Sequence, residues 1–204
     1  MIKAVLFDLG GVYFENGTKK FIQNLSDKLN ISFAELYPIF REGKSLEYRK
    51  NKISGKDFFA WASKKLDNKV SPQELNHLWV SQYTEIPGIR NIINELKSKE
   101  ILVTVLSDNV PERIEYLQQK YKFLDLFDDV VLSYEVNLTK ASPEIFKLAL
   151  SRIDIKPNEA VFVDDRELNL QVADKMGIKT ILFSSVTDLN NKINNILKEV
   201  SKAE

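Results

Sequence analysis

The sequence predicts an α/β protein with a doubly wound, Rossmann-like parallel sheet and an inserted all-helical cap domain. Five short runs of β-branched and aromatic residues recur along the chain, and helical patterns alternate with them. One long stretch, residues 17–85, holds helical patterns and no convincing strand. We therefore expect a core domain of residues 1–16 and 86–204, and a cap domain of residues 17–85.

The first predicted strand is the run KAVLF at residues 3–7. The other four are predicted at residues 101–107, 129–133, 159–163 and 179–183. Each run is apolar at successive positions, which is typical of a parallel strand that is buried on both faces.

The cap stretch follows the first strand and shows two helix starts. Ser32 is followed three residues later by Glu35, and Ser71 by Glu74. Both pairs have the form of a capping box, in which the serine and the acid satisfy each other's backbone N–H groups. Pro87 marks the return to the core.

The remaining helices flank the later strands. Ser142 as the cap and Pro143 at the first helical position begin a helix after the third strand. Apolar positions that share a helical face are Ile89, Ile92, Ile93 and Leu96 before the second strand, Leu168, Val172 and Met176 after the fourth, and Leu189, Ile193, Ile196 and Leu197 after the fifth.

Composition narrows the classes of function. Lys plus Arg equals Asp plus Glu at 29 each, so we expect neither nucleic acid nor an anionic membrane surface as a partner. The chain has no cysteine, which excludes disulfides, thiolate nucleophiles and sulfur-ligated metals and favours a cytoplasmic location. The N-terminus does not resemble an export signal, and no apolar run has the length of a membrane span.

Polar side chains stand where the predicted strands end. Asp8 follows the first strand, Ser107 ends the second, and Asp164 and Asp165 follow the fourth. Lys140 lies in the loop after the third strand. Because ligands of doubly wound sheets bind at the carboxyl ends of the strands, we expect these five side chains to meet at one edge.

The charges of these residues predict a metal. Three carboxylates carry a formal charge of −3, and crowding them is unfavourable unless cations share the site. One Mg²⁺ and Lys140 supply +3, and Mg²⁺ suits oxygen ligands that it shares with a substrate phosphate. Ser107 and the backbone N–H groups after it offer donors to that phosphate. These charges therefore predict a pocket that accepts a phosphate.

These segments together resemble the haloacid dehalogenase superfamily of phosphohydrolases. The matching motifs are VLFDLGG with Asp8, VLSDN with Ser107, LTKASPEIF with Lys140, and VFVDDRELN with Asp164 and Asp165. The resemblance covers nearly the whole chain, because residues 17–85 are similar to the helical cap of the superfamily's first cap class.

The resemblance implies a role for each motif. Asp8 is implied as the nucleophile that becomes an aspartyl phosphate, and as a Mg²⁺ ligand. The carbonyl of Gly10 is implied as a second ligand. The pair Asp164 and Asp165, Asp165 in particular, is implied as a third.

The two remaining motifs are implied to bind the substrate. Ser107 would donate a hydrogen bond to the phosphate, and Asp108 beside it is assigned to substrate binding. Lys140 would neutralise both Asp8 and the transferring group. Positioning and charge stabilisation of this kind carry most of the catalysis in phosphoryl transfer.

The chain departs from the family at Gly10, where most of these phosphatases have a second Asp that acts as general acid and base. Its loss should weaken catalysis by roughly 10²- to 10⁴-fold without abolishing it. A minority branch of bacterial sugar-phosphate phosphatases is similar in having Gly here, and a good leaving group would need the acid least. Asp108 and Glu15 are candidate substitutes.

The third motif and the cap carry further differences and expectations. Ala141 and Ser142 stand where Pro and Asp are usual in the family, and Asn137 replaces a common Gly. In the cap, Arg41 and Arg49 are candidates to face the site, and a solvated face is the default expectation for both.

Three alternative functions stay open from the sequence. In a 2-haloacid dehalogenase the same Asp8 attacks carbon without a metal, and the intact acidic pair weighs against this. A catalytically silent binding protein is favoured by Gly10. A signalling receiver domain has similar residue types, but its acidic pair comes at the first strand and it has no helical insert.

Overall fold

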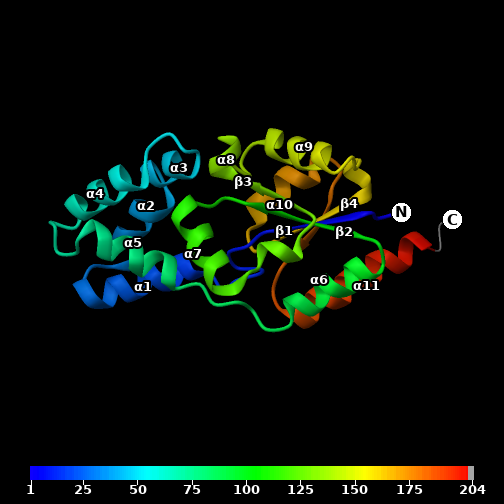
Figure 1. Cartoon of the computed structure of the whole chain (residues 1–204), viewed down its shortest axis with the longest axis horizontal. Helices are drawn as coiled ribbons and strands as arrows, with labels where there is room; N and C mark the ends of the chain where they lie inside the picture. Colours follow the sequence, from blue (N-terminus) through cyan, green and yellow to red (C-terminus); the bar gives the residue numbers. More distant parts are fainter. Residues whose placement is uncertain (202–204) are drawn as a thin grey trace.

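The computed structural model describes residues 1–201, with side chains through residue 198, and contains a five-stranded sheet (Figure 1). The strands are β1 (Ala4–Phe7), β2 (Leu102–Ser107), β3 (Asp129–Leu132), β4 (Ala160–Asp164) and β5 (Lys179–Leu182). Their order is β3-β2-β1-β4-β5, and every neighbouring pair is parallel. The strand order reverses between β1 and β4, as in doubly wound sheets. The predicted fold class is confirmed, and each strand ends within one residue of its prediction.

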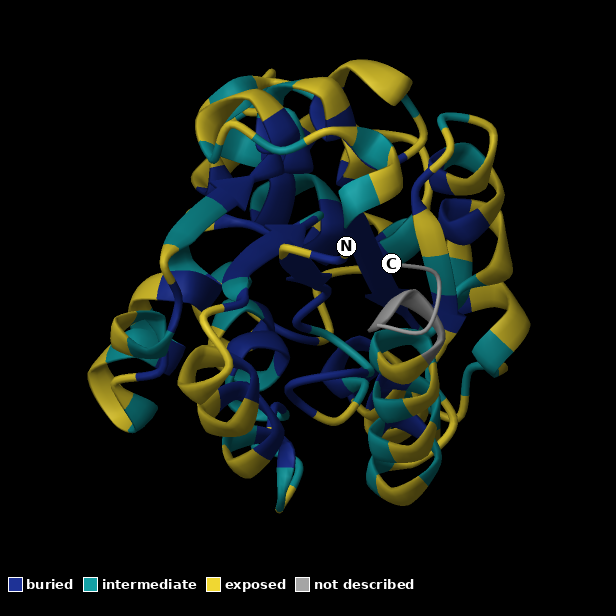
Figure 2. Cartoon of the chain, turned by 90° about the vertical axis from the view of Figure 1, so that its right-hand side faces the viewer, coloured by how far each residue is buried: buried dark blue, intermediate teal, exposed yellow. Residues whose placement is uncertain are grey.

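Helices cover both faces of the sheet. They are α6 (Ile89–Ser98), α7 (Pro111–Tyr121), α8 (Ser133–Val136), α9 (Pro143–Arg152), α10 (Glu167–Asp174) and α11 (Val186–Ser201), with 3-10 turns η1 (Leu124–Leu126) and η2 (Pro157–Glu159). Val5 and Phe7 of β1 pack in one cluster with apolar residues of α6 and α11, whereas Ala4 and Leu6 pack in another with residues of α9 and α10. This alternation leaves the three central strands β2, β1 and β4 buried and the outer helix faces exposed (Figure 2).

Between β1 and α6 the chain forms helices whose side chains build their own hydrophobic cluster. They are α1 (Gly17–Leu29), α2 (Phe33–Arg41), α3 (Lys44–Arg49), α4 (Gly55–Lys65) and α5 (Pro72–Ser81). Trp79 of α5 is fully buried among aromatic rings of this cluster, including Phe21, Phe40 and Phe58. In Figure 1 these helices lie beyond the carboxyl ends of the strands, and the N-terminus lies at the opposite end of the sheet. The boundaries of the two domains stay a prediction.

The helix starts follow the sequence signals in part. Ser32 and Glu35 form the full reciprocal capping box at α2. At α5, Ser71 accepts a bond from the backbone N–H of Glu74, but the Glu74 carboxylate pairs with Lys28 at 2.5 Å, so only half of the predicted box forms. Ser142 occupies the cap position of α9, although its hydroxyl donates to Glu144 and does not cap the helix.

Two predictions for the core helices need correction. Leu168 was expected on the buried face of α10 but is 66% exposed, and the helix buries Asn169, Leu170 and Ala173. The buried face thus includes a polar residue, and the Asn169 amide there donates to the Asp164 carboxylate. Helix α7 was not predicted, because its apolar face is short. Within the described residues, no helix has the length and apolar character to cross a bilayer.

Candidate active site

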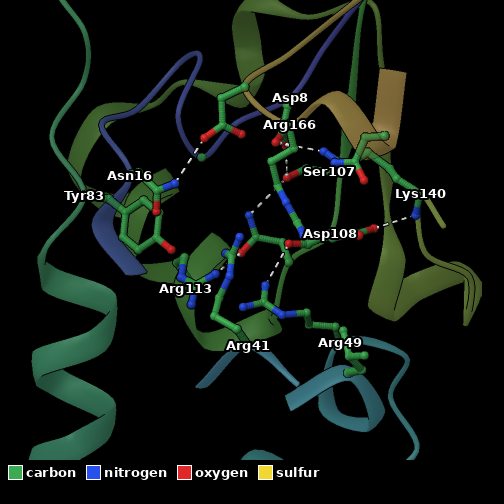
Figure 3. Close-up of a pocket in the computed structure, with 15 residues that line it drawn as sticks. Asp8, Asn16, Arg41, Arg49, Tyr83, Ser107, Asp108, Arg113, Lys140 and Arg166 are labelled. Carbon is green, nitrogen blue, oxygen red and sulfur yellow. Dashed lines mark hydrogen bonds and ion pairs between the residues drawn. The ribbon is translucent and has the colours of Figure 1, made fainter. Parts of the chain in front are cut away.

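A cavity lies at the carboxyl ends of β1, β2 and β4 (Figure 3). Its volume is about 50 Å³, enough for a small group, since one water needs roughly 10–15 Å³. It is lined by Asp8, Gly10, Asn16, Arg41, Leu46, Arg49, Tyr83, Ser107, Asp108, Asn109, Arg113, Lys140, Asp165, Arg166 and Asn169. All the predicted site residues thus line one cavity except Asp164, which is fully buried behind Lys140.

Asp8 follows β1 directly and is almost fully buried. Its Oδ1 accepts hydrogen bonds from the backbone N–H of Leu9 at 2.7 Å and from the Ser107 hydroxyl at 2.9 Å. Its Oδ2 lies 2.8 Å from the Lys140 ammonium. Both carboxylate oxygens are therefore oriented by groups from three separate segments of the chain.

Lys140 is the buried cation of the site, with its Nζ 2.6 Å from Asp164 Oδ2 as well as 2.8 Å from Asp8 Oδ2. Burial alone would lower the pKa of Lys140. The carboxylates of Asp164, Asp8 and Asp108 outweigh burial and raise this pKa above its ordinary value. Lys140 is therefore charged at neutral pH and balances part of the acidic cluster.

The two acids after β4 have different surroundings. Asp164 accepts hydrogen bonds from Lys140, from the backbone N–H of Arg166 at 2.8 Å and from Asn169, and burial raises its pKa to about 6. Asp165 is only partly buried and accepts one bond from the Asn16 amide at 3.1 Å. Burial first, and then repulsion from Asp8, raise the pKa of Asp165. Asp164 thus fixes Lys140, whereas Asp165 faces the cavity.

These residues fit a divalent cation. Carboxylate oxygens of Asp8, Asp164 and Asp165 all lie within 4.8 Å of one another, and all three are oxygen donors of the kind that Mg²⁺ prefers. Lys140 supplies one positive charge against three negative charges, so the cluster retains an excess of negative charge. Gly11 allows this approach: its φ is +94°, and a Cβ there would overlap the Asp165 carboxylate.

Two features define the loop that carries Lys140, where the sequence departs from the family pattern. Asn137 has a φ of 57°, in the left-handed region that Gly adopts freely and Asn tolerates better than most residues. The Asp108 side chain accepts a bond from the backbone N–H of Lys140 at 2.9 Å and so ties this loop to the end of β2. Burial raises the pKa of Asp108, and the nearby Lys140 charge opposes that rise.

Gly10 lines the cavity without a side chain, and the two candidate substitutes differ. Glu15 is exposed, lies 3.7 Å from Lys20 and is absent from the residues that line the cavity, so its proposed substitution for the missing acid is wrong. Asp108 lines the cavity. A Cβ on Gly10 would lie 3.5 Å from the Tyr83 ring, which is ordinary contact.

The cap arginines depart from the default expectation of a solvated face, and both take the alternative position at the site. Arg49 was expected in solvent but is 4% exposed, and its Nη1 donates to the backbone carbonyl of Asp108 at 2.9 Å. Arg41 is partly buried and lines the cavity. Arg113, which the sequence did not single out, is 1% exposed and donates from Nη1 to Asn109 Oδ1 at 3.0 Å.

Little in the sequence signals these residues. Arg113 stands beside Ile114 and on the same helical face as Leu117, both of which are buried, and this apolar neighbourhood is the one available sign. Asn16 follows the first motif closely and Arg166 lies within the fourth, so position relative to a motif could have found them.

Known proteins match most of the chain. A model of the haloacid dehalogenase-like hydrolase family matches residues 2–177. A D-ribitol-5-phosphate phosphatase of Bacteroides thetaiotaomicron is 26% identical over 206 residues, covering 97% of this chain and 99% of that protein. The pyrophosphatase PpaX of Bacillus cereus is 28% identical over 190 residues, covering 90% and 83%.

A solved structure matches over similar lengths. It is a haloacid dehalogenase family enzyme of Bacteroides thetaiotaomicron in complex with magnesium and inorganic phosphate. Its TM-score is 0.74 at 27% identity, with 91% of this chain and 96% of that chain covered.

Proposed function

The chain belongs to the haloacid dehalogenase-like hydrolase family, and from this premise we propose that it is a Mg²⁺-dependent phosphatase of a small phosphorylated metabolite. Asp8 acts as the nucleophile, and residues 17–85 act as the cap that covers it. The observation that most directly supports this proposal is the position of Asp8. Inside one cavity, one of its carboxylate oxygens lies 2.9 Å from the Ser107 hydroxyl and the other lies 2.8 Å from the Lys140 ammonium.

The proposed first step transfers the phosphoryl group to Asp8. An oxygen of the Asp8 carboxylate attacks phosphorus, the bond to the leaving oxygen breaks, and an aspartyl phosphate forms. Ser107 donates to a phosphoryl oxygen, and the Lys140 ammonium neutralises charge on the transferring group. Both side chains already lie at Asp8, so little reorganisation accompanies the reaction.

The second step returns the enzyme to its starting state. Water attacks the phosphorus of the aspartyl phosphate, inorganic phosphate leaves, and the Asp8 carboxylate is restored. Gly10 gives no side chain for proton transfer, and Asp108 is a carboxyl group that lines the cavity. We assign proton transfer to Asp108, because it is the carboxyl group of the lining that is neither a proposed metal ligand nor an ion-pair partner of Lys140. It would give a proton to the leaving oxygen in the first step and take one from the attacking water in the second.

The metal has a defined set of candidate ligands in this proposal. Asp8, the Gly10 carbonyl and Asp165 would hold Mg²⁺, and Asp164 holds Lys140 beside them. Bound there, Mg²⁺ would supply positive charge to the phosphoryl oxygens. The magnesium and phosphate complex of the Bacteroides enzyme, at 27% identity, supports this assignment.

The relatives support a small phosphorylated substrate. The two curated relatives carry names of enzymes for a phosphorylated pentitol and for pyrophosphate. The 2-haloacid dehalogenase alternative is less favoured, because displacement at carbon has no use for the excess negative charge of Asp8, Asp164 and Asp165.

An assay with p-nitrophenyl phosphate tests the proposal. We expect hydrolysis with Mg²⁺, loss of hydrolysis in excess chelator, and a loss of at least about 10³-fold in kcat for Asp8→Asn with an unchanged circular dichroism spectrum. Asp27→Asn, at an exposed position of α1, is the matched control. Chloride release from chloroacetate without Mg²⁺ would favour the dehalogenase instead, and full activity of Asp8→Asn would reassign the nucleophile.

A further inference from the structure

Two buried arginines at the cavity lack partners for part of their guanidinium groups. Nη2 of Arg49, and Nε and Nη2 of Arg113, are buried without a hydrogen-bond partner. Neither these arginines nor Arg41 takes part in an ion pair between described side chains. Burying a charged group without a counter-charge is costly, so such groups are normally paired.

The aromatic surroundings of Arg113 compensate for burial only in part. Its guanidinium carbon lies 4.4 Å from the centre of the Trp79 ring and 4.6 Å from that of Tyr83. These cation–π contacts hold the group in position. The nearby Glu112 carboxylate instead accepts the hydroxyl of Tyr48. Arg113 is thus fixed in orientation but keeps its charge uncompensated.

Arg49 is held just as firmly. Its side chain donates to the Asp108 carbonyl, and its own carbonyl accepts the Ser133 hydroxyl at 2.7 Å. In the view of Figure 3, Arg41, Arg49 and Arg113 gather on the side of the pocket opposite Asp8. This arginine cluster (Arg41, Arg49 and Arg113) therefore faces the part of a ligand that is remote from the reacting phosphoryl group.

The two ends of the cavity differ in formal charge. Lys140 and one divalent cation balance the three carboxylates at the metal site. The other charged side chains of the lining are the arginine cluster, Arg166 and Asp108, with a formal charge of +3. A phosphate dianion compensates two of these charges and leaves one.

We propose that the substrate carries a second anionic group, a carboxylate or a second phosphate, which the arginine cluster binds. This inference rests on the proposed phosphatase function and narrows its substrate class. A guanidinium offers paired N–H donors that match either oxyanion.

Matched substrate pairs test the inference on the wild-type protein. The carboxylate arm compares 3-phosphoglycerate with glycerol 3-phosphate, and the phosphate arm compares fructose 1,6-bisphosphate with fructose 6-phosphate. We expect a preference in kcat/KM of at least about 30-fold for the doubly anionic member of one pair, which identifies the group. Equal turnover within both pairs, or preference for the singly anionic members, overturns the inference.

Variants assign the preference to the arginines. Arg49→Gln and Arg41→Gln should each reduce the kcat/KM ratio within the preferred pair by at least about tenfold, and Arg49→Lys should retain part of it. Arg152→Gln, at an ion pair on α9 outside the cavity, is the control and should keep the ratio. The inference is overturned if the kcat/KM ratio is unchanged in both Arg49→Gln and Arg41→Gln. If Arg49→Gln does not fold, the ratio measured for Arg41→Gln alone tests the inference.

A binding measurement separates this inference from the phosphatase proposal. Calorimetric titration of Asp8→Asn in Mg²⁺ with each member of the preferred pair requires no turnover. Both pairs are titrated when the wild type shows no turnover. Tighter binding of the doubly anionic member of one pair then supports the inference without hydrolysis, whereas equal binding within both pairs overturns it even if hydrolysis is fast.

Discussion

The ammonium of Lys140 lies 2.8 Å from the carboxylate of Asp8, although the two residues come from loops far apart in the sequence. The same ammonium lies 2.6 Å from Asp164. One buried cation therefore lies between two buried carboxylates and offsets their mutual repulsion.

Lys140→Met should destabilise the protein and reduce its activity. Removing the cation leaves Asp8 and Asp164 buried without compensation, which costs about 3–5 kcal/mol of unfolding free energy. We expect kcat to fall by about 10²-fold or more. Urea denaturation and the phosphatase assay measure both effects, with Lys64→Met at an exposed position of α4 as the control. Equal stability of the two variants would contradict the bridging role.

Mg²⁺ should stabilise the wild-type protein against unfolding. At a concentration about 100 times its Kd, one bound ion adds about 2.7 kcal/mol. Asp165→Asn should lose this stabilisation, because Asp165 is the acid of the pair that faces the cavity. In the absence of Mg²⁺, the variant should be no less stable than the wild type. Thermal unfolding with and without Mg²⁺ measures this. A shift in Asp165→Asn as large as that in the wild type would exclude Asp165 as a ligand.

Gly10→Asp should raise the turnover of esters with poor leaving groups. The nearest atom to an added Cβ is 3.5 Å away, on the Tyr83 ring, so a Cβ at this position makes ordinary van der Waals contact. A general acid contributes roughly 10²- to 10⁴-fold, so we expect a gain in kcat for glycerol 3-phosphate that exceeds the gain for p-nitrophenyl phosphate.

Two controls sharpen the Gly10 experiment. Gly10→Asn has the same size without a titratable proton and should show no gain. Gly11→Ala should lower the melting temperature, because Gly11 has a φ of +94° and a Cβ there would overlap the Asp165 carboxylate. Equal gains for the Asp and Asn variants would mean that the side chain acts by something other than proton transfer.

Stability should fall in alkali, with Tyr48 contributing. Burial first, and then the hydrogen bond to Glu112, raise the pKa of Tyr48 above its ordinary value. As pH rises through about 10, the unfolded tyrosine loses its proton while the folded one keeps it, so the unfolding free energy falls by about 1.4 kcal/mol per pH unit for this group. The stabilisation is fully present below that pH.

Urea denaturation between about pH 9 and pH 11 measures the slope. Tyr48→Phe should show a shallower fall than the wild type. Tyr37→Phe, at a partly buried position of α2, is the control and should keep the wild-type slope more closely. Parallel slopes in the wild type and Tyr48→Phe would contradict the role of Tyr48.

The strands and the motif residues were accessible from the sequence because each carries a local signal. A buried parallel strand reads as an apolar run, and Asp8, Ser107 and Asp164 mark the ends of three such runs. The rule that strand ends converge then brought Lys140 into the same site. The roles of these residues stay a prediction.

The arginines carried no comparable signal. Arg49 is charged and lies on a short helix, so its sequence context suggests solvent, yet the end of β2 supplies the carbonyl that binds its side chain. The buried face of α10 was misjudged for a similar reason, because Asn169 turns inward to reach Asp164. Each of these outcomes depends on a partner remote in the chain.

The sequence by itself determined the sheet, the insertion of helices after the first strand, and the acids and lysine at the strand ends, because local hydrophobic periodicity and topology fix these features. Only the tertiary structure decided that Arg49 and Arg113 are buried at the cavity, that Glu15 stays outside it, and that Asp164 holds Lys140 while Asp165 faces inward. The physical reason is that burial and charge pairing are set by which segments pack together, and a side chain's own neighbours in the sequence do not contain that information.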